Sequence, residues 1–387
     1  MRGGASYGEG VHGRVIDVAS SDPSDHDTLQ YFLSQATGLR HRPQAMSQEW
    51  VLYIALDRGY RVVRASALSP VCRHVMRVIS GLGAGRGARM VAKMFVNDTS
   101  SVSKSISPKE AFLAELVTNM RILSAFGARK AQRLTTIQSV DVGSDALFGI
   151  SVGDIYFTLQ VLCESKLEDM TLFSTRDAVH AFVVDILDGF AHVHAAEIFH
   201  GDVKLDNMMF CGGSYKIIDW GYSASFAETR ELSVATRTPR NCASPMAWFA
   251  WGVPSDSPDG DISHALHLVM NTKIVRRSVF LLPGFRRLVD GAYASYTARL
   301  AALHNTHHGL TSAVRVAVIR DLVPSFDLYN FGLVVASIAL SSSIGVSDAP
   351  FRRALLGLST RLMYYSHPEF VGNDATAAVA WWRQHMV

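Results

Sequence analysis

Two short strings in the chain contain the residue types that phosphoryl transfer requires. His200–Asn207 has the spacing H-x-D-x-K-x-x-N, and Asp219 opens a D-x-G string twelve residues beyond Asn207. At these intervals Asp202 can lie beside an attacking hydroxyl, Lys204 beside the transferred phosphoryl group, and the amide oxygen of Asn207 on a metal. Asp219 adds a carboxylate, which Mg²⁺ prefers when it also binds substrate phosphates. The two strings predict a phosphotransferase.

The segments around the first string predict the elements that position it. Asp177–His194 carries apolar residues at the i, i+3, i+4, i+7 spacing of an amphipathic helix. Met208–Phe210 and Tyr215–Ile218 are apolar runs joined by the turn sequence Cys211–Ser214, which predicts a hairpin. The expected order is therefore helix, loop, hairpin and metal loop.

These strings and their flanks resemble the catalytic loop and the metal-binding loop of protein kinases. Upstream, Val91-Ala92-Lys93 resembles the kinase strand whose Lys contacts the α- and β-phosphates of ATP and pairs with a helix Glu. The predicted helix Pro108–Phe126 offers Glu110 and Glu115. Glu115 is preferred because it lies among apolar residues on a helix expected to dock against the sheet. The resemblance implies that Lys93 and Glu115 align the nucleotide.

The resemblance also places the rest of a nucleotide site. Ile155–Leu162 is similar to the last strand of the kinase N-lobe and its hinge, so Leu159 and Val161 are expected to bind the cofactor. Gly81–Gly87 is rich in glycine, but only five residues separate it from the phosphate-binding Lys, which leaves no room for the strand that a kinase has there. We interpret it as a turn and expect the phosphate-covering loop near Ala65–Cys72, which lacks glycines.

Beyond the second string the resemblance weakens. Ser244-Pro245-Met246 stands where a kinase usually has A-P-E, and Gly201 replaces the Arg of H-R-D that usually meets a phosphate on the activation loop. Activity is therefore expected not to require phosphorylation there. Asp327 opens a string similar to the kinase D-x-W-S-x-G helix, whose Asp accepts hydrogen bonds from the catalytic-loop backbone. An ordinary helix N-cap is the alternative for Asp327.

Composition narrows the class of protein. The chain has 387 residues, of which 48% are hydrophobic and 18% charged, and this excludes a disordered protein. A net charge of +3 gives no argument for nucleic acid binding. Four scattered cysteines fit reduced thiols in the cytoplasm or nucleus. The longest apolar stretch, Phe331–Leu340, is half a membrane span and predicts a buried helix, and the start of the chain is not typical of a secretory signal.

We expect an α+β, bilobal protein-kinase-like fold, with a small β-rich N-lobe containing one main helix and a larger, mostly helical C-lobe. Residues 1–45 are predicted to be a partly flexible extension, 46–163 the N-lobe and 164–387 the C-lobe. An insert at about 252–323 is predicted to hold two helices, Ile262–Ser278 and Leu288–Ala302. The resemblance implies a Ser/Thr protein kinase that uses ATP and Mg²⁺ and acts on a protein substrate. Divergence outside the strings suggests a virus-encoded enzyme.

Two other functions stay open at this point. Small-molecule phosphotransferases similar to aminoglycoside or choline kinases use H-G-D-x-x-x-x-N and I-D-W, as here, whereas the Lys of the first string argues against them. A pseudokinase that acts as a binding scaffold would explain the missing glycines and the missing Glu of A-P-E. The retention of Lys93, Asp202, Asn207 and Asp219 together argues for catalysis instead.

Overall fold

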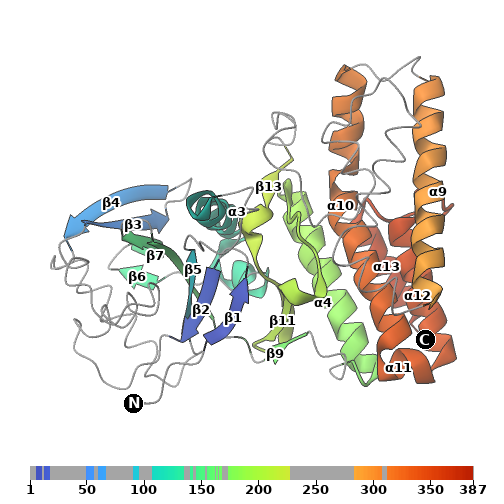
Figure 1. Ribbon diagram of the computed structural model, residues 1–387, viewed down its shortest axis with the longest axis horizontal. Helices are drawn as coiled ribbons and strands as arrows, with labels where there is room; N and C mark the ends of the chain where they lie inside the picture. The colour runs from blue at the N-terminus through green and yellow to red at the C-terminus, as the bar shows by residue number, and fades with distance from the viewer. Residues whose placement is uncertain are drawn as a thin grey trace. The chain divides into compact units, whose positions relative to one another are not determined.

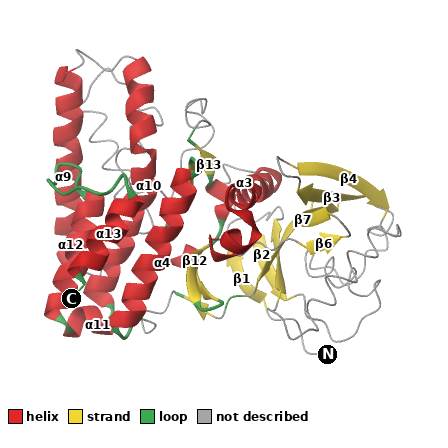
Figure 2. Ribbon diagram, turned by 180° about the vertical axis from the view of Figure 1, so that it is seen from behind, coloured by secondary structure: helices red, strands yellow, loops and turns green. Residues whose placement is uncertain are grey.

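The computed structural model describes residues 6–10, 13–17, 49–55, 60–66, 90–95, 107–134, 140–142, 145–152, 155–161, 163, 165–167, 173–226, 283–306 and 312–386. The chain divides into two compact units, Met1–Glu164 and Ser165–Val387 (Figures 1 and 2). In the described residues the first unit has a β-sheet and one helix, and the second is mainly helical with two small sheets. This is an α+β fold.

The sheet of the first unit is antiparallel and has the strand order β1-β2-β5-β8-β7-β3-β4, with β6 paired to β7. Lys93 on β5 lies opposite Val15 of β2 and Thr158 of β8. The apolar and β-branched residues of β2, β5 and β8 favour the extended backbone of a strand. The strands are β1 (Ser6–Gly10), β2 (Gly13–Asp17), β3 (Glu49–Ala55), β4 (Tyr60–Ser66), β5 (Met90–Phe95), β6 (Val140–Val142), β7 (Asp145–Val152) and β8 (Ile155–Val161).

Helix α3 (Pro108–Leu134) packs on this sheet against β5 and β8 (Figure 1). Its start is a capping box, in which the Glu110 amide donates to Ser107 Oγ at 3.2 Å and the Ser107 amide donates to the Glu110 carboxylate at 2.8 Å. Close packing of the helix needs a glycine on β7, because a Cβ at Gly149 would lie 2.9 Å from the ring of Phe112. These contacts fix which face of α3 meets the sheet.

One prediction about this sheet is wrong. β1 and β2 lie inside residues 1–45, which we expected to be an extension, yet β2 pairs with the strand that carries Lys93. The β-branched and aromatic runs Trp50–Ile54 and Tyr60–Val63 predict two strands, which form as β3 and β4 at the opposite edge of the sheet from β1. Local patterns predict that a strand forms but not which strand it pairs with. The run His74–Ile79 also predicts a strand, and it lies outside the described residues.

Helix α4 (Arg176–Ala195) confirms the helix predicted over Asp177–His194. It begins at the N-cap Thr175, whose side chain accepts a hydrogen bond from the Ala178 amide at 3.2 Å. Its apolar stripe is buried against β12, α10 and α13. The buried residues are Val179, Phe182, Val183, Ile186, Leu187, Phe190 and Val193.

The small sheets of the second unit hold the two chemistry-bearing strings. The predicted hairpin is confirmed as β11 (Met208–Cys211) and β12 (Ser214–Ile217), and β9 (Ser165–Lys166) pairs with β11. β10 (Ile198–Phe199) pairs with β13 (Ala224–Ser225). Two short 3₁₀ turns lie between these strands, Leu205–Asn207 before β11 and Trp220–Tyr222 before β13.

The core of the second unit is a group of helices around α10. These are α4, α9 (Pro283–Thr306), α10 (Ser312–Ser341), α11 (Ser343–Ser347), α12 (Ala349–Met363) and α13 (Ala375–His385). The predicted buried helix over Phe331–Leu340 is confirmed within α10. Of the two helices predicted in the insert, Leu288–Ala302 lies within α9, whereas Ile262–Ser278 lies outside the described residues.

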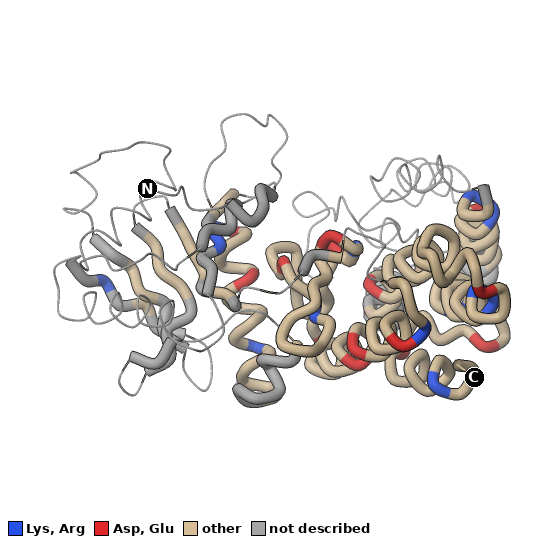
Figure 3. The backbone as a smooth tube through the Cα atoms, turned by 90° about the horizontal axis from the view of Figure 1, so that it is seen from below, with Lys and Arg blue, Asp and Glu red and all other residues tan. Residues whose placement is uncertain are grey.

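The helices of the second unit carry residues of both signs of charge. Lys and Arg positions are interspersed with Asp and Glu positions along its helices (Figure 3). Among the described helices, none combines the length and the hydropathy that crossing a bilayer would need.

Candidate active site

The loop His200–Asn207, which resembles a kinase catalytic loop and is called the catalytic loop below, follows β10, and Asp327 binds its backbone. This carboxylate is fully buried, and its two oxygens accept hydrogen bonds from the amides of His200 at 2.8 Å and Gly201 at 2.9 Å. The His194 ring at the end of α4 also contacts it, with Nε2 3.0 Å from Oδ2. The predicted support is confirmed, and the N-cap alternative is wrong because Asp327 lies inside α10. A charged acceptor that binds two successive amides fixes the loop backbone.

The His200 ring connects the catalytic loop to the metal loop. The Asp202 amide donates to Nδ1 at 3.2 Å, so Nδ1 carries no hydrogen. Nε2 then carries the proton and donates to the carbonyl of Ile218 at 2.9 Å. The ring of Trp220 packs edge-on against this imidazole, with the ring centroids 4.7 Å apart. Both neighbours of Asp219 in the chain are therefore tied to His200.

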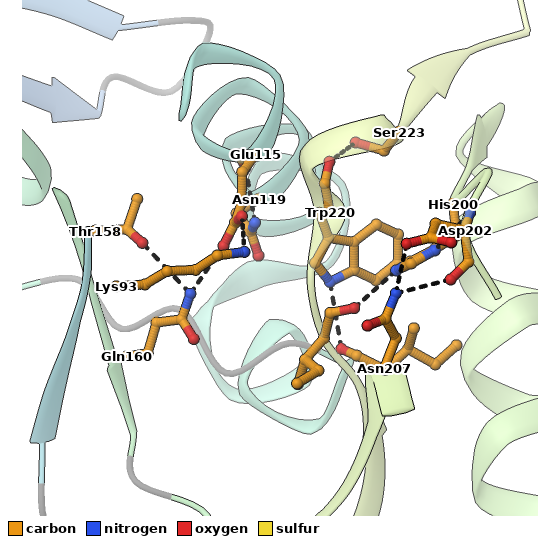
Figure 4. Close-up of polar contacts among 12 residues, drawn as sticks. Lys93, Glu115, Asn119, Thr158, Gln160, His200, Asp202, Asn207, Trp220 and Ser223 are labelled. Atoms are coloured by element: carbon orange, nitrogen blue, oxygen red, sulfur yellow. Dashed lines mark hydrogen bonds and ion pairs between the residues drawn. The ribbon is translucent and has the colours of Figure 1, made fainter. Parts of the chain in front are cut away.

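Asp202 is 1% exposed and sits at the centre of this loop. Its Oδ2 lies 2.7 Å from Lys204 Nζ. The same Oδ2 lies 2.9 Å from Asn207 Nδ2 (Figure 4). Its Oδ1 is buried and accepts no hydrogen bond from the described residues. Burial raises the pKa of Asp202, the Lys204 ammonium opposes this rise, and the negative charge of Asp219 adds to it. A buried carboxylate with one unpartnered oxygen is suited to accept a proton from a substrate hydroxyl.

Asn207 and Asp219 present the candidate metal-binding oxygens. Asn207 Nδ2 donates hydrogen bonds to the backbone carbonyl and to the side chain of Asp202. The other side-chain atom, Oδ1, is therefore the one suited to bind a metal. Asp219 has φ 66° and ψ 63°, a left-handed conformation that is uncommon outside glycine and concentrates at functional sites. The turn after Asp219 is fixed by Ser223, whose Oγ donates to the carbonyl of Trp220 at 2.5 Å.

Gly201 has a physical reason to replace the Arg of H-R-D. Its φ is +77°, which residues with a side chain rarely adopt. A Cβ there would lie 2.9 Å from the carbonyl oxygen of Tyr222 and 3.3 Å from the ring of Phe199. The backbone of the catalytic loop thus lies directly against that of the metal loop. This position has no room for an Arg that could bind a phosphate.

In the first unit, the ion pair predicted between Lys93 and Glu115 is confirmed. Lys93 Nζ lies 2.5 Å from Glu115 Oε2, and Glu115 is 1% exposed. Glu110, the other candidate, is exposed and belongs to the capping box of α3. Glu115 has a further partner that the sequence did not suggest, because Gln160 on β8 donates to its Oε1 at 2.8 Å.

Leu159 and Val161 were predicted to bind the cofactor. Their backbones lie in β8, opposite Ala92 and Met90 of β5. β8 is therefore the strand next to the Lys93 strand, as the resemblance implies. The side chains of both residues lie outside the described part of the chain.

A family model for the protein kinase domain matches residues 129–246, which include the catalytic loop, the hairpin and the metal loop. This match supports membership of the protein kinase superfamily for that part of the chain. Comparison with curated proteins gives no significant match.

The sequence prediction missed a glycine-rich loop at the start of the chain. Residues 8–15 read G-x-G-x-x-G-x-V, the kinase pattern that covers the ATP phosphates. The structure places Gly8 and Gly10 at the end of β1 and Gly13 at the start of β2, with Gly10 paired to Gly13. This hairpin lies next to the Lys93 strand. The expectation of a glycine-free loop near Ala65–Cys72 is therefore wrong.

The polar run at residues 20–27 favours an extension over the whole start of the chain, and this prediction hides the glycine pattern that precedes it. The glycine spacing was the signal that could have corrected it. Ala65 belongs to β4, at the opposite edge of the sheet from β1. Residues 67–72 and 81–87 lie outside the described residues.

The oxygens of Asn207 and Asp219 are suited to a magnesium ion that is bound together with a nucleotide. Asp219 and Asn207 offer one carboxylate and one amide oxygen, and within the described residues no group of three or more His, Cys, Asp or Glu side chains could hold a metal by itself. Mg²⁺ needs only one or two protein carboxylates when phosphates and water complete its octahedral shell. The donor set therefore suits magnesium bound to ATP.

Proposed function

We propose that this kinase transfers the γ-phosphate of ATP to Ser or Thr hydroxyls of a protein, with Mg²⁺ as the metal. The observation that carries the proposal is the state of Asp202. Its Oδ2 is held by Lys204 and Asn207, and its buried Oδ1 has no hydrogen-bond partner among the described residues. A single acceptor atom of a fixed carboxylate is thus reserved for an incoming group.

Each residue takes a role that its surroundings support. Asp202 orients the substrate hydroxyl and accepts its proton, while the Lys204 ammonium, 26% exposed, neutralises charge that develops on the transferred phosphoryl group. Asn207 and Asp219 hold the metal. Bound ATP and Mg²⁺ supply the phosphoryl group and the divalent charge that neutralises it. Catalysis by these residues is positioning together with electrostatic stabilisation.

The first unit aligns the same nucleotide in this proposal. Lys93, oriented by Glu115, contacts the α- and β-phosphates, and the backbone of Gly8, Gly10 and Gly13 lines them. Backbone groups near Leu159 and Val161 receive the adenine. The glycine pattern removes one of the two arguments for a pseudokinase.

The two compact units are proposed to be the two lobes of a bilobal kinase. The N-lobe consists of about residues 46–163 together with the β1–β2 hairpin, and the C-lobe consists of residues 164–387. The insert at 252–323 belongs to the second lobe, and its role is not assigned. The buried thiols of Cys163 and Cys211 support an intracellular, reducing location, cytoplasmic or nuclear. A virus-encoded origin stays a proposal on divergence alone.

A small-molecule phosphotransferase is the second candidate, and two observations favour it. Gly201 and Trp220 give the H-G-D and I-D-W strings of aminoglycoside and choline kinases, and both residues are locked into the site by backbone contact or burial. Lys204 on the Asp202 carboxylate favours the protein kinase.

The test is transfer of radiolabel from γ-labelled ATP with Mg²⁺ to casein and myelin basic protein, and in parallel to an aminoglycoside and choline. We expect labelled Ser or Thr in protein, lost in Asp202→Ala. Labelled small molecule alone would support the second candidate. Absence of transfer, with a melting temperature that rises when Mg²⁺ and ATP are added, would identify a pseudokinase and refute the proposal.

A further inference from the structure

Gln160 occupies a buried position on β8 from which it reaches the Lys93–Glu115 pair. Its side chain is 8% exposed, and its Nε2 donates to Glu115 Oε1 at 2.8 Å and to Thr158 Oγ1 at 3.3 Å (Figure 4). A carboxylate only accepts hydrogen bonds, so the amide must present its NH₂ group to Glu115. The orientation of Gln160 is therefore fixed by chemistry.

The two oxygens of Glu115 are held by two different strands. Oε2 contacts Lys93 on β5, and Oε1 accepts from Gln160 on β8. The pairing of Lys93 with Thr158 puts Lys93, Thr158 and Gln160 on the same face of the sheet, the face that α3 covers. Glu115 is therefore clamped across adjacent strands and cannot rotate away from Lys93 without losing the Gln160 bond.

Burial makes this clamp energetically important. Glu115 is 1% exposed, and a buried carboxylate is tolerated only when its oxygens are paired and hydrogen-bonded. Lys93, with a side chain 12% exposed, could otherwise turn its flexible ammonium toward water. The amide of Gln160 adds a neutral, directional donor that does not compete with Lys93 for charge.

We propose that Gln160 is a positioning residue that locks Glu115 against Lys93, so that the phosphate-binding lysine of this kinase is oriented before the nucleotide arrives. The inference rests on the proposed function of Lys93. It implies that α3 does not depend on a partner protein or a modification to bring Glu115 to Lys93, because the lock consists of residues of this chain.

The test compares Gln160→Met, which keeps the size and removes the donor, with Gln160→Glu, which sets a second carboxyl against Glu115. Ser151→Ala, a buried polar truncation on the same face of the neighbouring strand β7, is the matched control. A hydrogen bond to a charged group is worth roughly 10- to 100-fold in an equilibrium. We expect Gln160→Met to raise KM for ATP about tenfold or more with a smaller fall in kcat, and Ser151→Ala to match wild type.

The pH profile of Gln160→Glu distinguishes a lock from a merely structural role. At neutral pH the two carboxylates repel, whereas a protonated carboxyl at position 160 can again donate to Glu115. KM for ATP should therefore recover toward the wild-type value as the pH falls in this variant and in no other. A misfolded variant would not recover on acidification, so an unchanged KM–pH profile would overturn the proposal.

A second measurement does not depend on kinase activity. Acetic anhydride labels free amines, so its rate at Lys93 in the nucleotide-free full chain, read by mass spectrometry, reports how firmly the ammonium is held. We expect labelling several-fold faster in Gln160→Met than in wild type or Ser151→Ala. Faster labelling in a chain without transferase activity would refute the proposed function and retain the lock. Equal labelling together with equal KM values would refute the lock and retain the function.

Discussion

Replacing Gly201 by alanine measures how tightly the catalytic loop is packed on the metal loop. Two costs are expected. The first is conformational, because φ at Gly201 is +77° and an L-residue in this left-handed region costs roughly 1–2 kcal/mol. The second is steric, because the new Cβ would lie 2.9 Å from the Tyr222 carbonyl oxygen, which is backbone and cannot rotate away.

A matched variant isolates the steric cost. Gly213, in the turn between β11 and β12, has φ +80°, and a Cβ there would meet nothing within 4 Å. Gly213→Ala should therefore lose only about 1–2 kcal/mol of unfolding free energy. Gly201→Ala should lose a further 1–3 kcal/mol, the usual range for overpacking. Urea unfolding of both variants gives the difference.

Activity should separate the two variants more sharply than stability does. Relief of the Tyr222 contact must move the backbone next to Asp202, and a displacement of this kind near reacting groups lowers kcat by roughly 10- to 100-fold. Gly213→Ala should keep the wild-type kcat. If the two variants lost equal stability and both stayed fully active, the two loops would not be in the contact described here.

Three further outcomes are expected. Asp327→Asn turns one acceptor of the catalytic-loop amides into a donor, so unfolding free energy should fall by roughly 2–3 kcal/mol, with kcat reduced; wild-type values for both would show that the buried carboxylate does not support the loop. Because burial raises the pKa of Asp202 above the ordinary 3.8, the base is protonated, and activity is lost, as pH falls through a value above 3.8. The same raised pKa means that the folded state favours the protonated form of Asp202. The stability that this form contributes is therefore present at acid pH and is lost as pH rises and the group ionises. Asp202→Asn should then be inactive yet gain stability relative to wild type as pH rises from 3 to 7, and a gain that fell over this range would contradict the assignment. Replacing Ser225, Thr229 and Thr236 together with Ala should leave turnover nearly intact, whereas a hundredfold loss would show that the activation segment must be phosphorylated.

Ser223 is not replaced together with Ser225, Thr229 and Thr236. It lies in the same segment, but it is 3% exposed and its hydroxyl closes the turn after Asp219. Its truncation would remove a structural hydrogen bond, so a loss of activity would say nothing about phosphorylation. Thr229 and Thr236 lie outside the described residues, and their role rests on sequence alone.

Local patterns predicted the elements that lie close to the catalytic strings. The apolar spacing before His200 is that of α4, and the Gly-Gly turn is that of the β11–β12 hairpin, because both depend on contacts within a few residues. The choice of Glu115 over Glu110 also followed from local neighbours. An apolar setting predicted burial, and burial predicted the ion pair.

Relations across the sheet could not be predicted in this way. The pairing of β2 with β5 joins residues far apart in sequence, and the positions of β3 and β4 at the opposite edge follow from the same long-range choice. The contact of Gln160 with Glu115 depends on the register between β5 and β8. A shift of one residue would turn Gln160 to the other face of the sheet.

The proposed function requires that Lys93 and Asp219 act on a single magnesium-bound nucleotide. Calorimetric titration of the full chain with Mg²⁺ and a non-hydrolysable ATP analogue tests it most directly, using wild type, Lys93→Ala, Asp219→Asn and, as control, Gly213→Ala. The account predicts one nucleotide per chain, binding weakened at least about tenfold by each of the first two substitutions, and no change in the control. Wild-type affinity in either Lys93→Ala or Asp219→Asn would contradict it.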